Sequence, residues 1–327
     1  MKVCVTGGTG FTGAALVERL LDDGHAVSVL DKQPGLIADR LQKRGAELIY
    51  GSVTDPKVVA QAVKGCEVVF HLAAAFRELN VPDSVYKDVN VGGTRVVAEQ
   101  SLQAGARKLV YCSTQGVHGH ITSPPGNENS PIAPADYYQQ TKYDGELELP
   151  NFQDKGLEYT IIRPTAIYGP GDPGRFVMIY RRAKKGVFPM FGSGRTYYHP
   201  VYIDNLVDAF VLAMPQGVGR GQAYIIADEQ YFSLDELVKR VGKAIGVDVR
   251  VPHYPIWPLI LGGHVVEKVC KPFGITPPIF PRRVDWFRQV RAFDISKAKK
   301  DLHYRPRVGI DEGLRRTGDW YSKEGYI

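Results

Sequence analysis

Short apolar runs alternate with longer amphipathic stretches through the first half of the chain. Each run suits a buried strand, and the amphipathic stretches carry apolar residues every three or four positions, as helices do. Strands that alternate with helices in this way predict an α/β fold with a doubly wound parallel sheet. The expected strands lie at residues 3–5, 26–30, 47–50, 68–72, 108–112 and 157–163, and the clearest helices at residues 83–105 and 137–149.

The pattern changes near residue 169. Beyond this point proline and glycine become more frequent, aromatic residues cluster, and apolar runs no longer alternate cleanly with helical stretches. We therefore expect a first domain over residues 1–168 and a smaller subdomain over most of residues 169–327. Residues 201–214 and 223–227 are expected to return to the main sheet and complete it, which makes the C-terminal subdomain discontinuous.

The composition of the 327 residues is that of an ordinary globular protein, with 44% hydrophobic and 23% charged residues. The formal net charge is +6, but basic and acidic residues are interspersed, so a solvated basic face is favoured over nucleic-acid binding. No apolar run reaches the ~18 residues of a membrane span. A strand begins directly at the N-terminus and leaves no room for a signal peptide, so a cytoplasmic protein is expected.

Cysteine and histidine give no support to a metal or redox centre. The four cysteines are scattered without a Cys-x-x-Cys pair, which favours buried, reduced thiols. The eight histidines include no pair at helical spacing with a third ligand nearby. Neither a metal site nor a redox motif is predicted.

A glycine-rich turn joins the first strand to the first helix and reads Thr-Gly-Gly-Thr-Gly-Phe-Thr-Gly. Glycine permits the tight turn, lets the backbone approach a pyrophosphate, and lets the helix pack close to its strand. The helix N-terminus adds free N–H groups and a positive dipole end. This pattern predicts a dinucleotide site, with a purely structural turn as the alternative. The residues expected to bind are Gly7, Gly10, Phe11, Thr12 and Gly13.

Asp31 closes the second strand, 18 residues beyond Gly13. An acidic residue at about 20 residues from such a turn accepts hydrogen bonds from the adenosine ribose hydroxyls. Its charge would repel a 2′-phosphate, which favours NAD(H) over NADP(H). Lys32 weakens that preference slightly, and a capping role for Asp31 in the next loop is the alternative.

Thr114, Tyr138 and Lys142 form the candidate catalytic group. Tyr138 and Lys142 are four residues apart on an expected helix and so share a face, where an ammonium lowers the pKa of a nearby phenol. A hydroxyl at the end of strand 108–112 could hold a substrate oxygen against that phenol. Hydride transfer at a secondary alcohol needs such an acid–base group beside a nicotinamide. A second Tyr-x-x-x-Lys spacing, at Tyr180 and Lys184, lacks a preceding strand-end hydroxyl and is not predicted to react.

Together with the glycine turn, the segments HLAA, CSTQGVHG, Tyr138-x-x-x-Lys142 and RPTAIYGP resemble the extended short-chain dehydrogenase/reductases, the NAD-dependent epimerase/dehydratase family. The resemblance implies a Rossmann-type NAD-binding domain over residues 1–168, a mostly substrate-binding subdomain over residues 169–327, and a homodimer formed through residues 83–105 and 137–149. Tyr138 would be the acid–base group, Lys142 would hold the nicotinamide ribose, and Thr114, or else Ser113, would bind the substrate oxygen. Further cofactor contacts are implied for Lys32, Ser52, Val53, Leu72, Ala73, Ala74, Asn90, Pro164 and Ile167.

Two departures from the sugar-nucleotide epimerases of this family concern the substrate. Those enzymes usually carry an asparagine where Ala166 stands and an arginine where Tyr198 stands, although Arg195 could substitute through a shifted loop. Each missing charge-assisted hydrogen bond is worth about 1.5–3 kcal/mol, which argues against a nucleoside diphosphate.

The RPTAIYGP segment and the apolar residues 251–285 are instead similar to the 3β-hydroxysteroid and sterol dehydrogenases. In that group the apolar region roofs the substrate pocket and sometimes touches membranes; an ordinary core helix with a proline-rich loop is the alternative. An apolar secondary alcohol or ketone, sterol-like or a long-chain β-hydroxy/keto compound, is therefore the predicted substrate. A nucleotide-sugar epimerase or dehydratase and a non-catalytic dinucleotide sensor are the alternatives. The residues expected to line the pocket are Phe76, His118, Tyr168, Tyr197 and Tyr198.

Overall fold

The structure is a computed structural model that describes residues 1–76, 81–172, 174–262 and 284–327. Its centre is a seven-stranded sheet in the order β11-β6-β5-β4-β1-β2-β3, with every neighbouring pair parallel. The predicted doubly wound parallel sheet is confirmed, and each predicted strand is present within one or two residues of its expected ends. The strands are β1 (Lys2–Thr6), β2 (Ala26–Asp31), β3 (Glu47–Tyr50), β4 (Val68–His71), β5 (Lys108–Cys112), β6 (Glu158–Pro164) and β11 (Gln222–Ile226).

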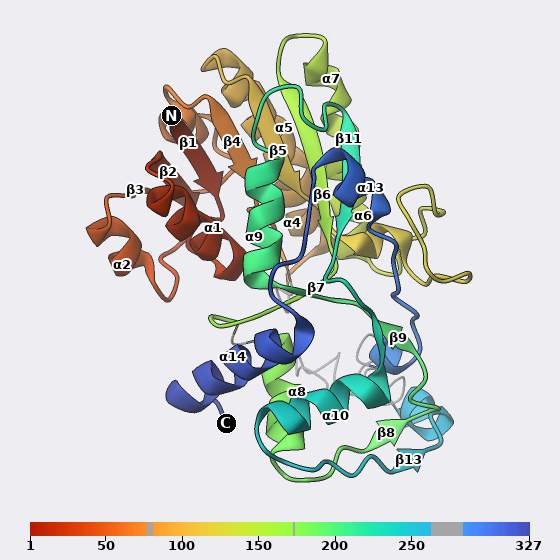
Figure 1. Cartoon of the computed structure of the whole chain (residues 1–327). Coiled ribbons are helices and arrows are strands. Elements are labelled where there is room, and N and C mark those ends of the chain that lie inside the picture. The colour runs from red at the N-terminus through yellow and green to blue at the C-terminus, as the bar shows by residue number, and fades with distance from the viewer. Residues whose placement is uncertain (77–80, 173, 263–283) are drawn as a thin grey trace.

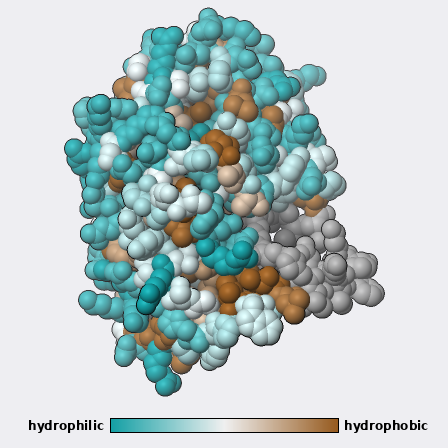
Figure 2. Space-filling view, turned by 90° about the vertical axis from the view of Figure 1, so that its right-hand side faces the viewer, coloured by the Kyte–Doolittle hydropathy of each residue, from teal (hydrophilic) through white to brown (hydrophobic). Residues whose placement is uncertain are grey.

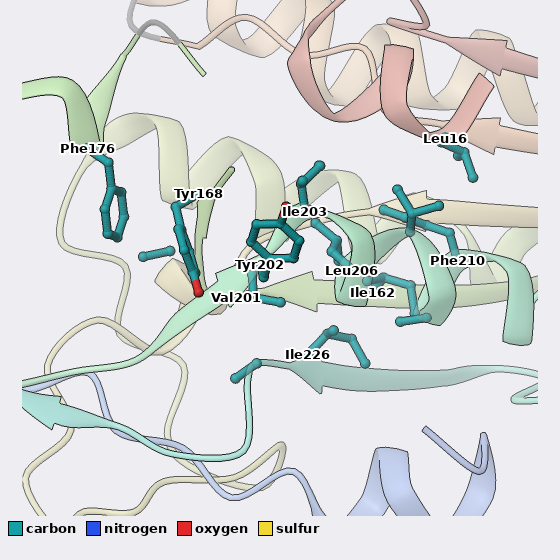
Figure 3. Close-up of a cluster of buried hydrophobic side chains, with 14 of the residues drawn as sticks. Leu16, Ile162, Tyr168, Phe176, Val201, Tyr202, Ile203, Leu206, Phe210 and Ile226 are labelled. Atoms are coloured by element: carbon teal, nitrogen blue, oxygen red, sulfur yellow. The ribbon is translucent and has the colours of Figure 1, made fainter. Parts of the chain in front are cut away.

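Helices cover both faces of this sheet because successive strand residues point to opposite sides. Val3 and Val5 of β1 pack with α1 (Phe11–Asp22) and α9 (Ile203–Leu212) on one face. Figure 3 shows Leu16 of α1 and Phe210 of α9 in the same buried cluster. Cys4 packs on the other face, where α3 (Pro56–Val63) and α5 (Gly93–Gln103) lie. Shorter helices, α2 (Ala38–Lys43), α4 (Asp83–Lys87), α7 (Pro150–Gln153) and α13 (Ser296–Asp301), complete the layers together with α6 (Tyr137–Glu148).

The predicted helix over residues 83–105 is interrupted by a π-helical turn, η1 (Asp88–Gly92), between α4 and α5. A 3₁₀ segment, η2 (Gln115–His118), follows the end of β5 and packs on α6. These two local departures from regular helix both lie where the candidate site residues are.

A second layer of structure lies beyond the carboxyl ends of the strands (Figure 1). It contains α8 (Arg175–Ala183), α10 (Leu234–Ala244) and α14 (Ile310–Lys323), and α10 packs against both of the others. The two-stranded pairs are β7 (Ala166–Tyr168) with β10 (Pro200–Tyr202), β9 (Tyr197–Tyr198) with β12 (Phe232–Ser233), and β8 (Met190–Phe191) with β13 (His253–Tyr254); the short η4 (Asp285–Phe287) follows.

The expected return of residues 201–214 to the main sheet is wrong, whereas residues 223–227 do return, as β11. Strand β10 pairs with β7 outside the main sheet. Residues 203–212 form helix α9, because Ile203, Leu206 and Phe210 recur at helical rather than alternating spacing. All three are buried against the sheet in Figure 3.

Part of the apolar segment 251–285, at residues 263–283, lies outside the described residues. The described part exposes 67% of Trp257 and 61% of Leu261. Figure 2 shows one face that is mostly hydrophilic, with hydrophobic residues gathered in its lower part beside the grey atoms. No helix within the described ranges is long and apolar enough to cross a membrane.

Candidate functional site

The glycine turn is packed tightly at the carboxyl edge of the sheet. Gly7 has φ +70°, and a Cβ there would lie 2.7 Å from the Ala73 nitrogen just beyond β4. A Cβ at Gly13 would lie 2.0 Å from the Gly7 carbonyl oxygen, so α1 packs directly on the turn. Gly10 is exposed, and no described side chain caps the N-terminus of α1. The open helix terminus beside a bare backbone turn fits a pyrophosphate.

Asp31 lies beside this turn, at the end of β2. Its Oδ2 accepts hydrogen bonds from the Thr9 nitrogen at 2.9 Å and from Thr9 Oγ1 at 2.7 Å, while Oδ1 accepts from the Lys32 nitrogen at 2.8 Å. The carboxylate thus fastens the turn and the following loop, as the capping alternative proposes. A carboxylate has about four acceptor positions, so Oδ1 retains one for a ribose hydroxyl.

Lys142 is the most unusual group of the site. Its side chain is 1% exposed, and its Nζ lies 4.1 Å from the centroid of the Tyr111 ring without a hydrogen-bond partner anywhere in the described residues. Burial lowers the pKa of Lys142 to about 8. A buried ammonium without a partner is costly unless a ligand supplies one, and the hydroxyls of a nicotinamide ribose would do so.

Tyr138 lies one helical turn before Lys142 on α6, which begins with Asp136 accepting a hydrogen bond from the Gln139 nitrogen. Tyr138 is half-buried, and its ring centroid lies 4.8 Å from that of Phe76. Phe76 itself is 44% exposed. The candidate acid–base group therefore stands beside an accessible aromatic side chain.

Ser113 and Thr114 differ in what their hydroxyls do. Ser113 is buried and its Oγ donates to Glu146 Oε1 at 2.5 Å. Thr114 is partly exposed and its Oγ1 accepts from the Gly116 nitrogen at 3.0 Å, which leaves its O–H free to donate. A Cβ at Gly116 would lie 2.8 Å from Cγ of Gln139, the residue after Tyr138, so η2 and α6 are in close contact. This arrangement favours Thr114 as the group for a substrate oxygen.

Asn90 lies in the π-helical turn and is fully buried. Its amide oxygen accepts from the Ala75 nitrogen at 2.8 Å, and its amide nitrogen donates to Ala75 O at 3.2 Å and to Thr141 Oγ1 at 3.0 Å. Thr141 directly precedes Lys142. Asn90 therefore ties the chain beyond β4 to the helical turn that carries Lys142.

The other predicted cofactor residues lie along the same carboxyl edge, because all seven strands are parallel. Val53, beyond β3, is buried under Gly93, whose Cβ would lie 2.7 Å from it, and Pro164 ends β6 beside Ile226. Leu72, Ala73 and Ala74 directly follow β4, Ser52 and Lys32 follow β3 and β2, Phe11 and Thr12 open α1, and Ile167 lies in β7.

The predicted substrate residues divide into two groups. Phe76 and Tyr197 are exposed, by 44% and 39%. Tyr168 is fully buried; its hydroxyl donates to Asp228 at 3.3 Å and its ring packs on Phe176 and Tyr202 (Figure 3). Tyr198 and His118 are also buried, at 1% exposure each, so these three belong to the packed interior.

The two positions that distinguish sugar-nucleotide enzymes also lie in the interior. Ala166 is 4% exposed in β7, and the Tyr198 ring packs between Phe176 and Trp286. Arg195 is exposed on the neighbouring loop. Within the described residues, no group of three or more His, Cys, Asp or Glu side chains could hold a metal ion.

Two buried charged residues of this region were not identified from the sequence. Glu146 lies on α6 one turn after Lys142, and Arg163 lies in β6 directly before Pro164; they form an ion pair. The i, i+4 rule that linked Tyr138 to Lys142 also links Lys142 to Glu146, so the same spacing could have identified Glu146 from the sequence.

A sequence model of the NAD dependent epimerase/dehydratase family matches residues 3–227. The chain is 32% identical to the 3beta-hydroxysteroid-dehydrogenase/decarboxylase isoform 2 of Arabidopsis thaliana, over 97% of this chain but only 61% of that protein. It is 31% identical to the 2-alkyl-3-oxoalkanoate reductase of Stenotrophomonas maltophilia, over 97% of this chain and 98% of that protein. Among solved structures, a UDP-glucose 4-epimerase of Thermotoga maritima has a TM-score of 0.79 at 26% identity, covering 99% of both chains.

Proposed function

The chain belongs to the NAD-dependent epimerase/dehydratase family, the extended short-chain dehydrogenase/reductases, and from that premise we propose that it is an NAD(H)-dependent oxidoreductase of an apolar alcohol or ketone. The observation that carries the proposal is the buried, unpartnered Nζ of Lys142, one helical turn from Tyr138. The site fits the cofactor because the open glycine turn, Asp31 and Lys142 offer partners for pyrophosphate, adenosine ribose and nicotinamide ribose respectively.

The bound cofactor would supply the hydride acceptor or donor. The chain's own residues orient the substrate and move one proton. Thr114 Oγ1 would donate a hydrogen bond to the substrate oxygen, and the Tyr138 hydroxyl would give its proton to that oxygen in reduction or, as phenolate, remove it in oxidation. Since the pKa of Lys142 is about 8, the ammonium is its main form at neutral pH, and this positive charge favours the phenolate of Tyr138.

Three observations support an apolar substrate. The sites of the missing anion-binding residues, Ala166 and Tyr198, are packed in the interior and offer no cation to a diphosphate. Phe76, beside Tyr138, is accessible and apolar. The relatives include a 3beta-hydroxysteroid dehydrogenase/decarboxylase and a 2-alkyl-3-oxoalkanoate reductase, whose names give a steroid and an alkyl-substituted oxoalkanoate as substrates.

The test is oxidation of NADH, followed by its absorbance, with a panel of 3-ketosteroids and 2-alkyl-3-oxoalkanoates. Tyr138→Phe is expected to lower kcat at least about 100-fold, the usual share of general acid–base catalysis, with an unchanged Kd for NADH. Tyr137→Phe, at the exposed neighbouring position on α6, is the matched control and should keep full activity. Near-normal turnover by Tyr138→Phe would refute the assignment of the acid–base group.

A nucleotide-sugar epimerase or dehydratase is the second candidate, favoured by the likeness to the UDP-glucose 4-epimerase structure. Such an enzyme would retain NAD through purification and would be stabilised against heat by UDP-sugars. An unchanged Tm with every nucleotide sugar tested would reject it. Failure of both the ketone and the nucleotide-sugar panels, with NADH still bound, would favour a dinucleotide sensor.

We also propose a homodimer formed through α4, α5 and α6, as the family resemblance implies. Arg95 of α5 and Glu148 of α6 lie on this outer surface and form an ion pair, with 53% and 18% of their side chains exposed. Light scattering coupled to size-exclusion chromatography distinguishes a mass near 36.2 kDa from twice that value.

A further inference from the structure

Four buried polar side chains meet directly behind the candidate site. They are Ser113, His118, Glu146 and Arg163, all at most 6% exposed, and we refer to them as the buried quartet. Arg163 donates to both oxygens of Glu146, at 2.9 Å and 2.5 Å, and to His118 Nε2 at 3.1 Å. Ser113 Oγ donates to the same carboxylate at 2.5 Å.

Every polar side-chain atom of the quartet has a hydrogen-bond partner. A guanidinium only donates, so His118 Nε2 must accept, and His118 Nδ1 carries the proton that is donated to the Ser130 carbonyl oxygen at 3.0 Å. His118 is therefore neutral, and burial together with the charge of Arg163 lowers its pKa. The carboxylate of Glu146 accepts three hydrogen bonds, two from Arg163 and one from Ser113.

Three members of the quartet lie next to a candidate site residue on a different element. Ser113 directly precedes Thr114 at the end of β5, Glu146 follows Lys142 by one turn of α6, and Arg163 directly precedes Pro164 at the end of β6. The quartet thus joins the three elements that carry the hydroxyl, the lysine and the proline. Within the described structure, Glu146 and Arg163 form the only ion pair in which both side chains are less than a tenth exposed.

Burying two charges is costly, and well-packed apolar residues of the same size often stabilise a fold as well or better. Stability alone therefore does not account for this pair. A forked, bidentate pair does fix direction and distance in a way that apolar packing does not.

We propose that the buried quartet is the positioning device of the site, with Glu146 and Arg163 as positioning residues that set the place of Lys142 and Thr114 relative to the cofactor. For turnover, the inference rests on the proposed function; for cofactor affinity, it rests only on Lys142 meeting the nicotinamide ribose. Removing the ion pair should therefore weaken NADH binding even in a variant that stays folded.

The test compares two double variants, one of the buried ion pair and one of an exposed ion pair. Glu146→Leu with Arg163→Met removes both buried charges and leaves apolar side chains of similar size. Glu67→Leu with Arg107→Met does the same to an exposed pair at the opposite, amino-terminal edge of the sheet, where the two side chains are 2.7 Å apart and 43% and 60% exposed. The Kd for NADH is measured by fluorescence titration of the full chain, at a temperature well below each Tm.

The quartet variant is expected to bind NADH about tenfold more weakly, as when one hydrogen bond to a charged group is lost, and the exposed-pair variant to bind normally. An unchanged Kd in the folded quartet variant would overturn the inference, because a merely structural role lowers Tm without moving the Kd. Where the wild type reduces a ketone, kcat at saturating NADH should fall about 100-fold; an unchanged kcat would remove Thr114 from the inference.

Arg163→Lys keeps the test decisive if the double variant does not fold. It preserves the buried cation but loses the fork and the contact with His118. We expect a Kd for NADH raised about threefold, and a value equal to that of the wild type would overturn the inference. A wild-type chain that binds NADH but reduces no ketone contradicts the proposed function alone, since the Kd comparison is still made.

Discussion

Gly13→Ala tests whether the glycine turn binds a dinucleotide or is only structural. The new Cβ would lie 2.0 Å from the Gly7 carbonyl oxygen and 2.7 Å from the Gly8 Cα, where contacts below 3.0 Å are essentially never found. Either the turn or α1 must therefore move by about 1 Å before the contact reaches 3.0 Å. Overpacking of this kind costs about 1–3 kcal/mol, and the helix propensity of alanine offsets about 1 kcal/mol of it.

The expected net loss of unfolding free energy is thus at most about 2 kcal/mol, or a fall of a few degrees in Tm. The effect on NADH should be larger, because the displaced backbone N–H groups make charge-assisted hydrogen bonds to phosphate. Losing one such bond weakens binding about tenfold or more. The assays are thermal unfolding of the free protein and fluorescence titration with NADH.

Gly92→Ala is the matched control. Gly92 is also helical, with φ −59°, and a Cβ there would have no atom within 4 Å. This variant should have an equal or slightly higher Tm and an unchanged Kd for NADH. If Gly13→Ala lowers Tm but binds NADH like Gly92→Ala, the turn is structural and the dinucleotide assignment is refuted.

Two further predictions concern Lys142 and Asp31, the residues proposed to bind the two riboses of the cofactor. Because burial lowers the pKa of Lys142 to about 8 from the ordinary 10.5, its ammonium is present below that pH and lost as pH rises through it, so NADH affinity should fall above pH 8. Lys142→Met should bind NADH more weakly at pH 7, and its Kd should not change as the pH rises through 8. A variant whose Kd depends on pH as that of the wild type does would show that Lys142 is not the titrating group. Asp31→Ser removes the charge that repels a 2′-phosphate and should bring the Kd for NADPH to within about tenfold of that for NADH. A wild type that already binds both equally would contradict the role given to Asp31.

The parts of the fold that were predicted correctly are those set by local sequence. Strands β3 and β5 have the predicted bounds, residues 47–50 and 108–112. The start of α3 is set locally as well, because Asp55 caps the helix by accepting from the Lys57 nitrogen and Pro56 suits the first helical position.

Strand β10 shows why the second half was harder to predict. An apolar segment such as Pro200–Tyr202 suits either the main sheet or a small separate pair, and only its partner decides between them. That partner is β7, which lies too far away in the sequence for a local pattern to indicate the pairing. Residues 203–212 are apolar on more than one side because α9 is covered both by the sheet and by α1.

Burial of polar groups accounts for what the sequence left open at the site. Ser113 and Thr114 are chemically alike and adjacent, and only the carboxylate of Glu146 separates them, by taking the hydroxyl of the first into the interior. His118 was expected to line the pocket but is buried in the interior, where Arg163 donates to its Nε2 at 3.1 Å. Each choice depends on a charge contributed by a distant element. A buried acid one turn after the lysine and a buried arginine before the proline therefore belong in the same pattern as Tyr138 and Lys142, since they decide which of the two hydroxyls is taken into the interior.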